Sequence, residues 1–375
     1  MDIFLDEWDY LIHLIRCAIH DIQPREMPES LSFERVCEFG IYHEVANIAF
    51  DSVERLKKKP EPELYQKWED LRNKAIVRHI NQSWAAEEIR SALREAGIRW
   101  TEVQGTKIQP LYPKPEWRTM SDLDFIIDPE NLSGVETVLE QLGYTCRLVN
   151  GDEVQGYRPP NIHIEMHSAY FSQYTEYEKV MRPPFAALDE KGEPVPEELY
   201  LYNILHIFKH YHYAGFGIRR VLDAYFLNRH YGGRIQRETV WAALAQAGAA
   251  EFADQLASLA ENWFSETEQS ISRNEIAVHI FRWGVHGTGT TQRKNYLKQR
   301  IPQGKWGEKI RYLLERFLGT GGVIRQNYPI VSRFWILYPV CWLHRLLRGL
   351  RPAALKRLGW EIGQVIRMKK TRKEP

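Results

Sequence analysis

The sequence predicts an α+β protein in which a small mixed β-sheet lies between two helical regions. Two stretches, 121–128 and 161–167, alternate apolar and polar residues, which is the period-two pattern of a half-buried strand. Apolar residues recur at helical spacing through the first hundred residues and again from Pro196 onward. We therefore expect four regions along the chain: an N-terminal helical region at 1–97, a sheet core at 98–190, a helical domain at 191–330 and a basic tail at 331–375.

The composition is typical of a soluble globular protein. The chain has 375 residues, of which 44% are hydrophobic and 26% charged, so it can bury a large core. Its formal net charge of +1 creates no overall field that would attract nucleic acid or membrane. Met1 is followed by acidic residues rather than a basic signal-peptide region, no apolar run approaches the length of a membrane span, and the four cysteines are scattered. We expect a cytoplasmic protein.

The first hundred residues predict three helical segments followed by a short strand. The first segment, at 5–19, is broken by prolines, the second covers 32–57, and the third covers 62–96 with Gly97 as its C-cap. The charged residues of the third segment are expected to form a solvated face. A strand at 98–103 then leads into a glycine turn.

The elements between and after the two alternating stretches complete the expected sheet. The chain that follows the glycine turn begins as a helix and is broken by three prolines. A helix at 132–142 and a strand at 144–149 are expected after the first stretch. Asp128, which follows that stretch, is a strand end or a helix cap rather than a metal ligand in this interpretation.

Three carboxylates are predicted to converge on one face of the sheet. Asp122 and Asp124 leave the same face of the first stretch, and Glu165 shares one face of the second with His163 and His167. If the two strands are neighbours, the carboxylates meet. Like charges held that close are costly unless a cation neutralises them, and oxygen ligands suit Mg²⁺ or Mn²⁺. This is the arrangement of a two-metal phosphoryl-transfer site.

The same residues carry a resemblance to a superfamily of enzymes. Gly105 and Thr106, followed by Asp122-x-Asp124 and by Glu165 on a later strand, resemble the DNA polymerase β-type nucleotidyltransferase pattern. The resemblance implies that the turn holds a triphosphate and that the three acids hold the metal ions. It implies transfer of a nucleotidyl group from an NTP to a hydroxyl or phosphate acceptor on a small molecule, peptide or protein.

A narrower resemblance is to the bacterial "uncharacterised nucleotidyltransferase" family. The runs at 104–124, 165–167 and 204–223 are similar to segments of that family, so the resemblance covers about 100–223. Gln104 stands where the family has Lys, and Thr106 stands where the wider superfamily prefers Ser or Gly. The family resemblance also implies a role in natural-product or polysaccharide biosynthesis.

Three polar residues near the turn are candidates for contact with the nucleotide. Lys107 and Arg118 could neutralise the β- and γ-phosphates, with Arg118 offering the better fork for bidentate contact. The alternative is that one or both are ordinary surface charges. Ser121 could cap or orient the first carboxylate.

The histidines and the arginines later in the chain are further candidates for the site, and each could instead have a purely structural role. His163 and His167 could contact phosphate, support the metal ligands or act as acid or base, or they could simply be hydrogen-bonded beside Glu165. His206 and His210 have the i,i+4 spacing of metal ligands without an HExxH motif, so they line the cleft or belong to the core. One arginine of Arg219 and Arg220 could face the nucleotide or acceptor, or Arg219 could pair with Asp223 one helical turn later.

The tail at 331–375 differs in composition from the rest of the chain. It holds 11 Lys and Arg against two Glu, and tryptophans and leucines are interleaved with the basic residues. Such a stretch could contact an anionic membrane peripherally or bind a phosphorylated partner. The interpretation favoured by the sequence is a C-terminal helix packed on the body with a frayed basic end.

Two other functions remain open from the sequence. The same metal site could transfer a sugar from a nucleotide-sugar to a phosphorylated peptide or glycan acceptor. Alternatively, the chain could be a non-catalytic helical adaptor, which the intact acidic triad argues against. No strip of aromatic and basic residues flanks the site, which disfavours a nucleic-acid polymerase.

Overall fold

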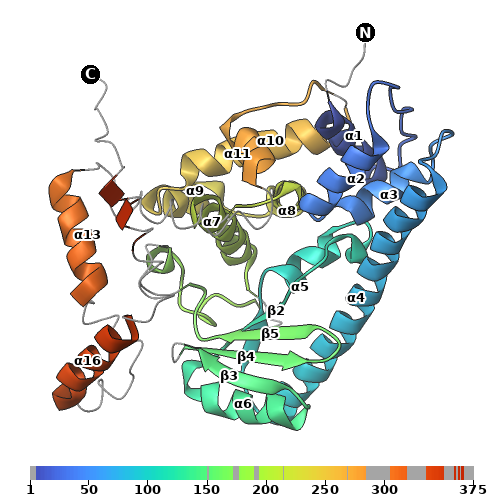
Figure 1. The fold of residues 1–375 in the computed structure, drawn as a ribbon. Helices are drawn as coiled ribbons and strands as arrows, with labels where there is room; N and C mark the ends of the chain where they lie inside the picture. The colour runs from blue at the N-terminus through green and yellow to red at the C-terminus, as the bar shows by residue number, and fades with distance from the viewer. Residues whose placement is uncertain are drawn as a thin grey trace. The chain divides into compact units, whose positions relative to one another are not determined.

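A computed structural model describes residues 6–149, 152–171, 177–189, 194–213, 215–267, 269–283, 305–318 and 335–349, and a few positions between 359 and 366 (Figure 1). These described residues form thirteen α-helices and one five-stranded mixed sheet, so the predicted α+β class is confirmed. The chain divides into two compact units, Met1–Gly287 and Thr288–Pro375. The domain boundaries predicted at residues 97, 190 and 330 are not tested by this division and stay predictions.

The N-terminal helices follow the predicted segments, except that the second segment is two helices. Asp6 accepts hydrogen bonds from two backbone amides of the first helix, and Ser32 caps the second in the same way. Glu44 takes a left-handed backbone conformation (φ 56°), which ends one helix and turns the chain into the next. The four helices are α1 (Glu7–Ile19), α2 (Phe33–Tyr42), α3 (Ala46–Val53) and α4 (Pro62–Glu95).

The sheet has the strand order β1-β2-β5-β4-β3, with β2 and β5 parallel and every other pair antiparallel. Strand β4 is absent from the sequence predictions, because its run of polar residues around Gly156 gives little apolar alternation. Helix α6 (Leu132–Gln141) connects β2 to β3. The strands are β1 (Trp100–Glu102), β2 (Leu123–Ile127), β3 (Thr145–Val149), β4 (Glu153–Arg158) and β5 (Ile162–His167).

The two faces of the sheet meet different surroundings. One face presents Phe125 and Ile164 to a core shared with α4 and α6, which contribute Ile89 and Leu139 among others. The polar residues of β2 and β5 leave from the other face. The alternation read from the sequence therefore sorts these side chains correctly between a buried apolar layer and a polar face.

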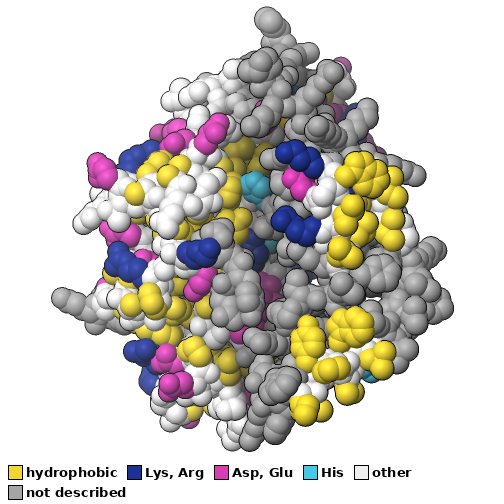
Figure 2. All heavy atoms as spheres, turned by 90° about the vertical axis from the view of Figure 1, so that its left-hand side faces the viewer, with side chains coloured by type: hydrophobic (Ala, Val, Ile, Leu, Met, Phe, Trp, Pro, Cys, Tyr) yellow, Lys and Arg dark blue, Asp and Glu magenta, His cyan; other side chains and the backbone are white. Residues whose placement is uncertain are grey.

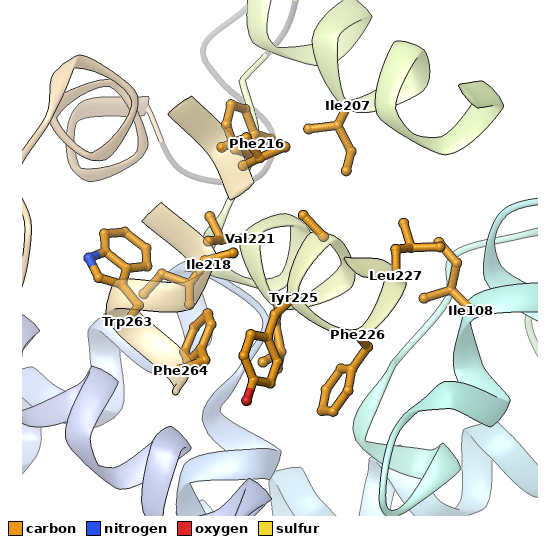
Figure 3. Close-up of a cluster of buried hydrophobic side chains, with 14 of the residues drawn as sticks. Ile108, Ile207, Phe216, Ile218, Val221, Tyr225, Phe226, Leu227, Trp263 and Phe264 are labelled. Carbon is orange, nitrogen blue, oxygen red and sulfur yellow. The ribbon is translucent and has the colours of Figure 1, made fainter. Parts of the chain in front are cut away.

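The remaining helices of the first unit contribute to one hydrophobic cluster with α8, which is buried along most of its length (Figure 3). Its Tyr225 and Phe226 lie in a cluster with Trp263 and Phe264 of α10. Burial of such large aromatic side chains fixes α8 firmly in the unit. These helices are α5 (Gly105–Ile108), α7 (Pro196–Tyr213), α8 (Ile218–Tyr231), α9 (Arg237–Gln246), α10 (Ala250–Phe264) and α11 (Glu275–Trp283).

The second unit contains helices α13 (Trp306–Leu318) and α16 (Tyr338–Gly349), with a short 3-10 turn at Trp335–Leu337 before α16. Helix α13 contacts α16. Among the residues that the structure describes, no helix has both the length and the apolar content that crossing a membrane would require.

Candidate metal and phosphate site

The two strands that carry the predicted carboxylates are neighbours. Strands β2 and β5 run parallel, and their register places Asp124 directly beside Glu165. Asp122 lies just before β2 on the same side. Ligand atoms of Asp122, His163 and Glu165 lie within 4.8 Å of one another, and so do those of Asp124, Glu165 and His167. Glu165 belongs to both groups, so the five side chains form one cluster.

The cluster concentrates negative charge at a partly buried place. Asp124 is only 5% exposed. Burial, together with the charges of Asp124 and Glu165, raises the pKa of Asp122 to about 6. Ser121 donates a hydrogen bond from its hydroxyl to Oδ1 of Asp122 over 3.1 Å, which orients this carboxylate as the sequence suggested.

His167 lies between the carboxylates. Its Nε2 is 3.4 Å from Oδ1 of Asp124 and 3.5 Å from Oε2 of Glu165, and its Nδ1 is 3.6 Å from Oε2 of Glu153. Burial opposes the charged ring, but hydrogen bonds to Asp124 and Glu165 outweigh it and raise the pKa of His167 to about 10. His163 is farther away, with Nδ1 3.9 Å from Oε1 of Glu165. The carboxylates thus stabilise the positively charged form of the His167 ring.

Strand β4 adds two polar residues that the sequence predictions missed. Gln155 pairs with Glu165 in the β4–β5 register, and its amide donates to Oε1 of Glu165 over 3.3 Å and to Oε1 of Glu153 over 2.6 Å. Arg147 of β3 donates to the side-chain oxygen of Gln155 over 2.7 Å, which fixes the direction of that amide. The signal in the sequence was the Glu153-x-Gln155 spacing, which puts both side chains on one face of a strand.

Helix α7 lies close to the polar face of the sheet. Its Tyr202 accepts a hydrogen bond from the side chain of Gln104 over 3.0 Å, which joins the helix to the glycine turn. The Nε2 atoms of His206 and His210 are 2.7 Å apart, so the i,i+4 spacing does bring the two rings together. Burial lowers the pKa of both, to about 3 for His210, so both rings are neutral and share one hydrogen bond. In the described part of the chain no third ligand atom joins them in a metal-binding group.

Two basic residues lie near the carboxylates, and the sequence predictions missed one of them, Lys209. Lys209 of α7 interacts electrostatically with Asp124 and Glu165, although burial lowers the pKa of its ammonium group. Arg220 of α8 interacts in the same way with Asp122. We call Lys209 and Arg220 the basic pair. Histidine, basic and acidic side chains are seen close together near the middle of the face in Figure 2.

The glycine turn is explained by packing. A Cβ atom on Gly105 would lie 2.3 Å from Sδ of Met120 and 2.9 Å from a terminal nitrogen of Arg118, so any larger residue would force these side chains to shift. The hydroxyl of Thr106 donates to the carbonyl of Val103 over 3.3 Å. Lys107 is half-buried on the four-residue helix α5. Contact of these three residues with a triphosphate stays a prediction.

Arg118 lies in a buried ion pair. Its guanidinium donates two hydrogen bonds to Asp223, over 2.8 and 3.0 Å, and the two side chains are 3% and 0% exposed. Tyr112 donates a third bond to the same carboxylate over 2.7 Å. The alternative of an ordinary surface charge is therefore wrong, and the geometry offers no support for a phosphate contact, because the guanidinium faces a carboxylate in the interior.

The alternative in which Arg219 pairs with Asp223 is wrong. Arg219 lies 2.5 Å from Oε2 of Glu44 and donates to the carbonyl of Thr119 over 2.6 Å. Asp223 accepts instead from Arg118, because the chain brings that residue to the interior from far along the sequence. Arg220, the next residue on α8, is the arginine of this helix that interacts with the carboxylate cluster.

Comparison with known proteins agrees with this geometry. The family model described as "Uncharacterised nucleotidyltransferase" matches residues 29–265, which is more than half of the chain and extends beyond the resemblance seen at 100–223. Neither the curated proteins nor the solved structures that were searched gave a match. The matched range contains the whole carboxylate cluster, the glycine turn and helices α7 and α8. The chain belongs to the uncharacterised nucleotidyltransferase family.

Proposed function

We propose that the protein transfers a nucleotidyl group from an NTP to a hydroxyl or phosphate acceptor on a small molecule, peptide or protein, in a Mg²⁺-dependent reaction. The observation that carries this proposal is the meeting of Asp122, Asp124 and Glu165 on adjacent parallel strands. Family membership supports the reaction type.

The residues of the cluster fit a hard divalent cation. They offer several carboxylate oxygens within a few ångströms of one another, and the raised pKa of Asp122 reflects its burial together with the negative charges of Asp124 and Glu165. Asp122 and Asp124 would hold Mg²⁺ or Mn²⁺, and Glu165 would complete the ligand set on the acceptor side. When bound, the metal neutralises phosphate charge and lowers the pKa of the acceptor hydroxyl.

The side chains of the protein would handle the acceptor's proton, bind the phosphates and orient Glu165. The acceptor oxygen forms a bond to the α-phosphorus while the bond to the leaving pyrophosphate breaks, and the acceptor's proton must go to a base. The hydrogen bond from His167 lowers the pKa of Glu165 and keeps it ionised, so Glu165 can accept a hydrogen bond from the acceptor hydroxyl and pass the proton on to solvent. The basic pair, Lys209 and Arg220, would hold the negatively charged phosphates beside the cluster. His163 and His167 would orient Glu165.

A thermal-shift panel tests the proposal directly. The four NTPs and common nucleotide-sugars are added with and without Mg²⁺ to the wild type and to the double variant Asp122→Asn/Asp124→Asn. A ligand that binds the folded state raises the melting temperature by mass action. We expect one or more NTPs to stabilise the wild type only with Mg²⁺, and the double variant to lose this effect.

The matched control is Asp128→Asn, which removes a carboxylate at the end of the same strand. Asp128 pairs with Arg99 over 3.1 Å near the surface, away from the cluster, so its variant should keep the NTP response. Stabilisation by a nucleotide-sugar alone would move the assignment to sugar transfer. If no donor shifts the wild type with Mg²⁺, the proposal is wrong and the adaptor interpretation gains weight.

A further inference from the structure

Charge is divided very unevenly between the two units. Residues 288–375 contain 20 Lys and Arg against four Glu, a formal net charge of +16. The first 287 residues contain 30 Lys and Arg against 45 Asp and Glu, a formal net charge of −15. The overall charge of +1 therefore hides two strongly charged units of opposite sign. Such asymmetry is typical of proteins whose basic part binds an anionic partner, such as nucleic acid or a membrane.

The described helices of the basic unit also carry exposed apolar stripes. On α13, Trp306, Ile310 and Leu314 recur every four residues and so lie on one face of the helix. They are 68%, 53% and 53% exposed. Lys305 and Arg311 are exposed beside this stripe. Large apolar side chains on a soluble helix are normally covered, so a repeated exposed stripe marks a contact surface.

A second stripe lies on the next described helix of the same unit. Ile336, just before α16, and Val340 and Leu343 within it are each more than half exposed. Their spacing again places them along one face. Because α13 contacts α16, both stripes belong to one small body of the chain.

We propose that residues 288–375 bind the surface of an anionic membrane, with the stripes of α13 and α16 inserted at the level of the lipid headgroups. We define this anchoring surface as Trp306, Ile310, Leu314, Ile336, Val340 and Leu343. An amphipathic helix of this kind lies in the plane of the interface, where apolar residues enter the bilayer boundary and basic residues face anionic lipids. The site chemistry proposed above is independent of this anchoring.

The combination of features favours lipid over nucleic acid. A protein binds nucleic acid through positive charge alone, or through positive charge together with exposed aromatic residues on which bases stack. The anchoring surface instead consists mainly of aliphatic side chains at helical spacing, with tryptophan at one end, which suits the boundary between headgroups and acyl chains. An acceptor attached to a lipid or held at a membrane would then be brought close to the enzyme.

Vesicle co-sedimentation of the full-length protein tests the proposal. Vesicles of phosphatidylcholine alone are compared with vesicles that also contain phosphatidylglycerol at about 30 mol%. We expect binding only to the anionic vesicles, with weaker binding when the salt concentration is raised. The double variant Ile310→Glu/Leu314→Glu should lower the partition coefficient by roughly tenfold or more, because two apolar side chains no longer leave water.

The matched control is Val77→Glu/Ile80→Glu, which places the same charges at exposed apolar positions on α4 of the acidic unit. This control should bind anionic vesicles like the wild type. Absence of vesicle binding, or equal binding to both kinds of vesicle, would overturn the proposal. So would tighter binding to duplex DNA or RNA that the Ile310→Glu/Leu314→Glu variant leaves unchanged. In that case the positive charge of the basic unit would bind nucleic acid rather than lipid.

Discussion

Replacing Asp223 by Asn should destabilise the protein strongly, because this change removes the charge that compensates a buried arginine. Asp223 is fully buried and accepts two hydrogen bonds from Arg118 and one from Tyr112. The amide of Asn keeps an acceptor for Tyr112, so the change isolates the charge. It leaves Arg118 without a counter-charge, with Arg220 nearby.

The expected loss in the free energy of unfolding is about 3–5 kcal/mol, which is the usual cost of removing one partner of a buried ion pair. For a unit of this size, such a loss lowers the melting temperature by about 6–10 °C. Urea unfolding followed by circular dichroism measures the change. The control is Asp128→Asn, whose carboxylate pairs with Arg99 near the surface and should cost less than about 1 kcal/mol.

Two further variants separate a structural from a ligand-binding role for Arg118. The pair Arg118→Met/Asp223→Leu removes both charges and should recover much of the stability lost by Asp223→Asn. Arg118→Met alone should unfold more easily in the absence of any ligand. If Arg118→Met instead kept wild-type stability and lost only the NTP-dependent shift, the reasoning would be refuted and Arg118 would be a phosphate ligand.

Three other predictions follow from individual contacts. Burial lowers the pKa of His43 to about 3, below that of the unfolded chain. The free energy of unfolding should therefore fall by about 1.4 kcal/mol per pH unit as the pH drops from about 6.5 towards 3. In His43→Gln this slope, measured by urea titrations at several pH values, should be smaller by the contribution of one proton. Gly105→Ala should cost about 1–3 kcal/mol, because its Cβ meets Met120, and Met120→Ala in the same chain should restore part of it. Lys209→Ala should weaken the Mg²⁺-dependent binding of the NTP donor by roughly tenfold in calorimetry, since it removes a charged contact to phosphate.

Each of these three has a control or a contrary outcome. An unchanged pH slope in His43→Gln would show that another group titrates. Gly134→Ala is the control for Gly105→Ala, because a Cβ there meets Ile98 at an ordinary 3.6 Å. Lys67→Ala, on the exposed face of α4, is the control for Lys209→Ala. Equal donor affinity in Lys209→Ala and the wild type would remove Lys209 from the phosphate site.

The sequence by itself determined the elements that depend on local periodicity and capping. The long helix α4 and the strands β2 and β5 lie close to their predicted ranges, and α7 begins at Pro196, where the helical spacing resumes, because alternation and helical spacing are local properties of the chain. The same alternation placed Asp124 and Glu165 on a polar face. Strand β4 escaped prediction, because it is stabilised by its neighbours β3 and β5 rather than by its own apolar residues.

Only the tertiary structure decided which charged residue meets which. Arg118 could not be separated from a phosphate ligand by sequence, since its partner Asp223 lies 105 positions away on another helix. Lys209 looked like an ordinary helix residue, and the choice between Arg219 and Arg220 was open, until α7 and α8 were packed beside the sheet. Periodicity fixes the face from which a side chain leaves its own element. The partner on that face is set by long-range packing, which brings together residues that no local pattern connects.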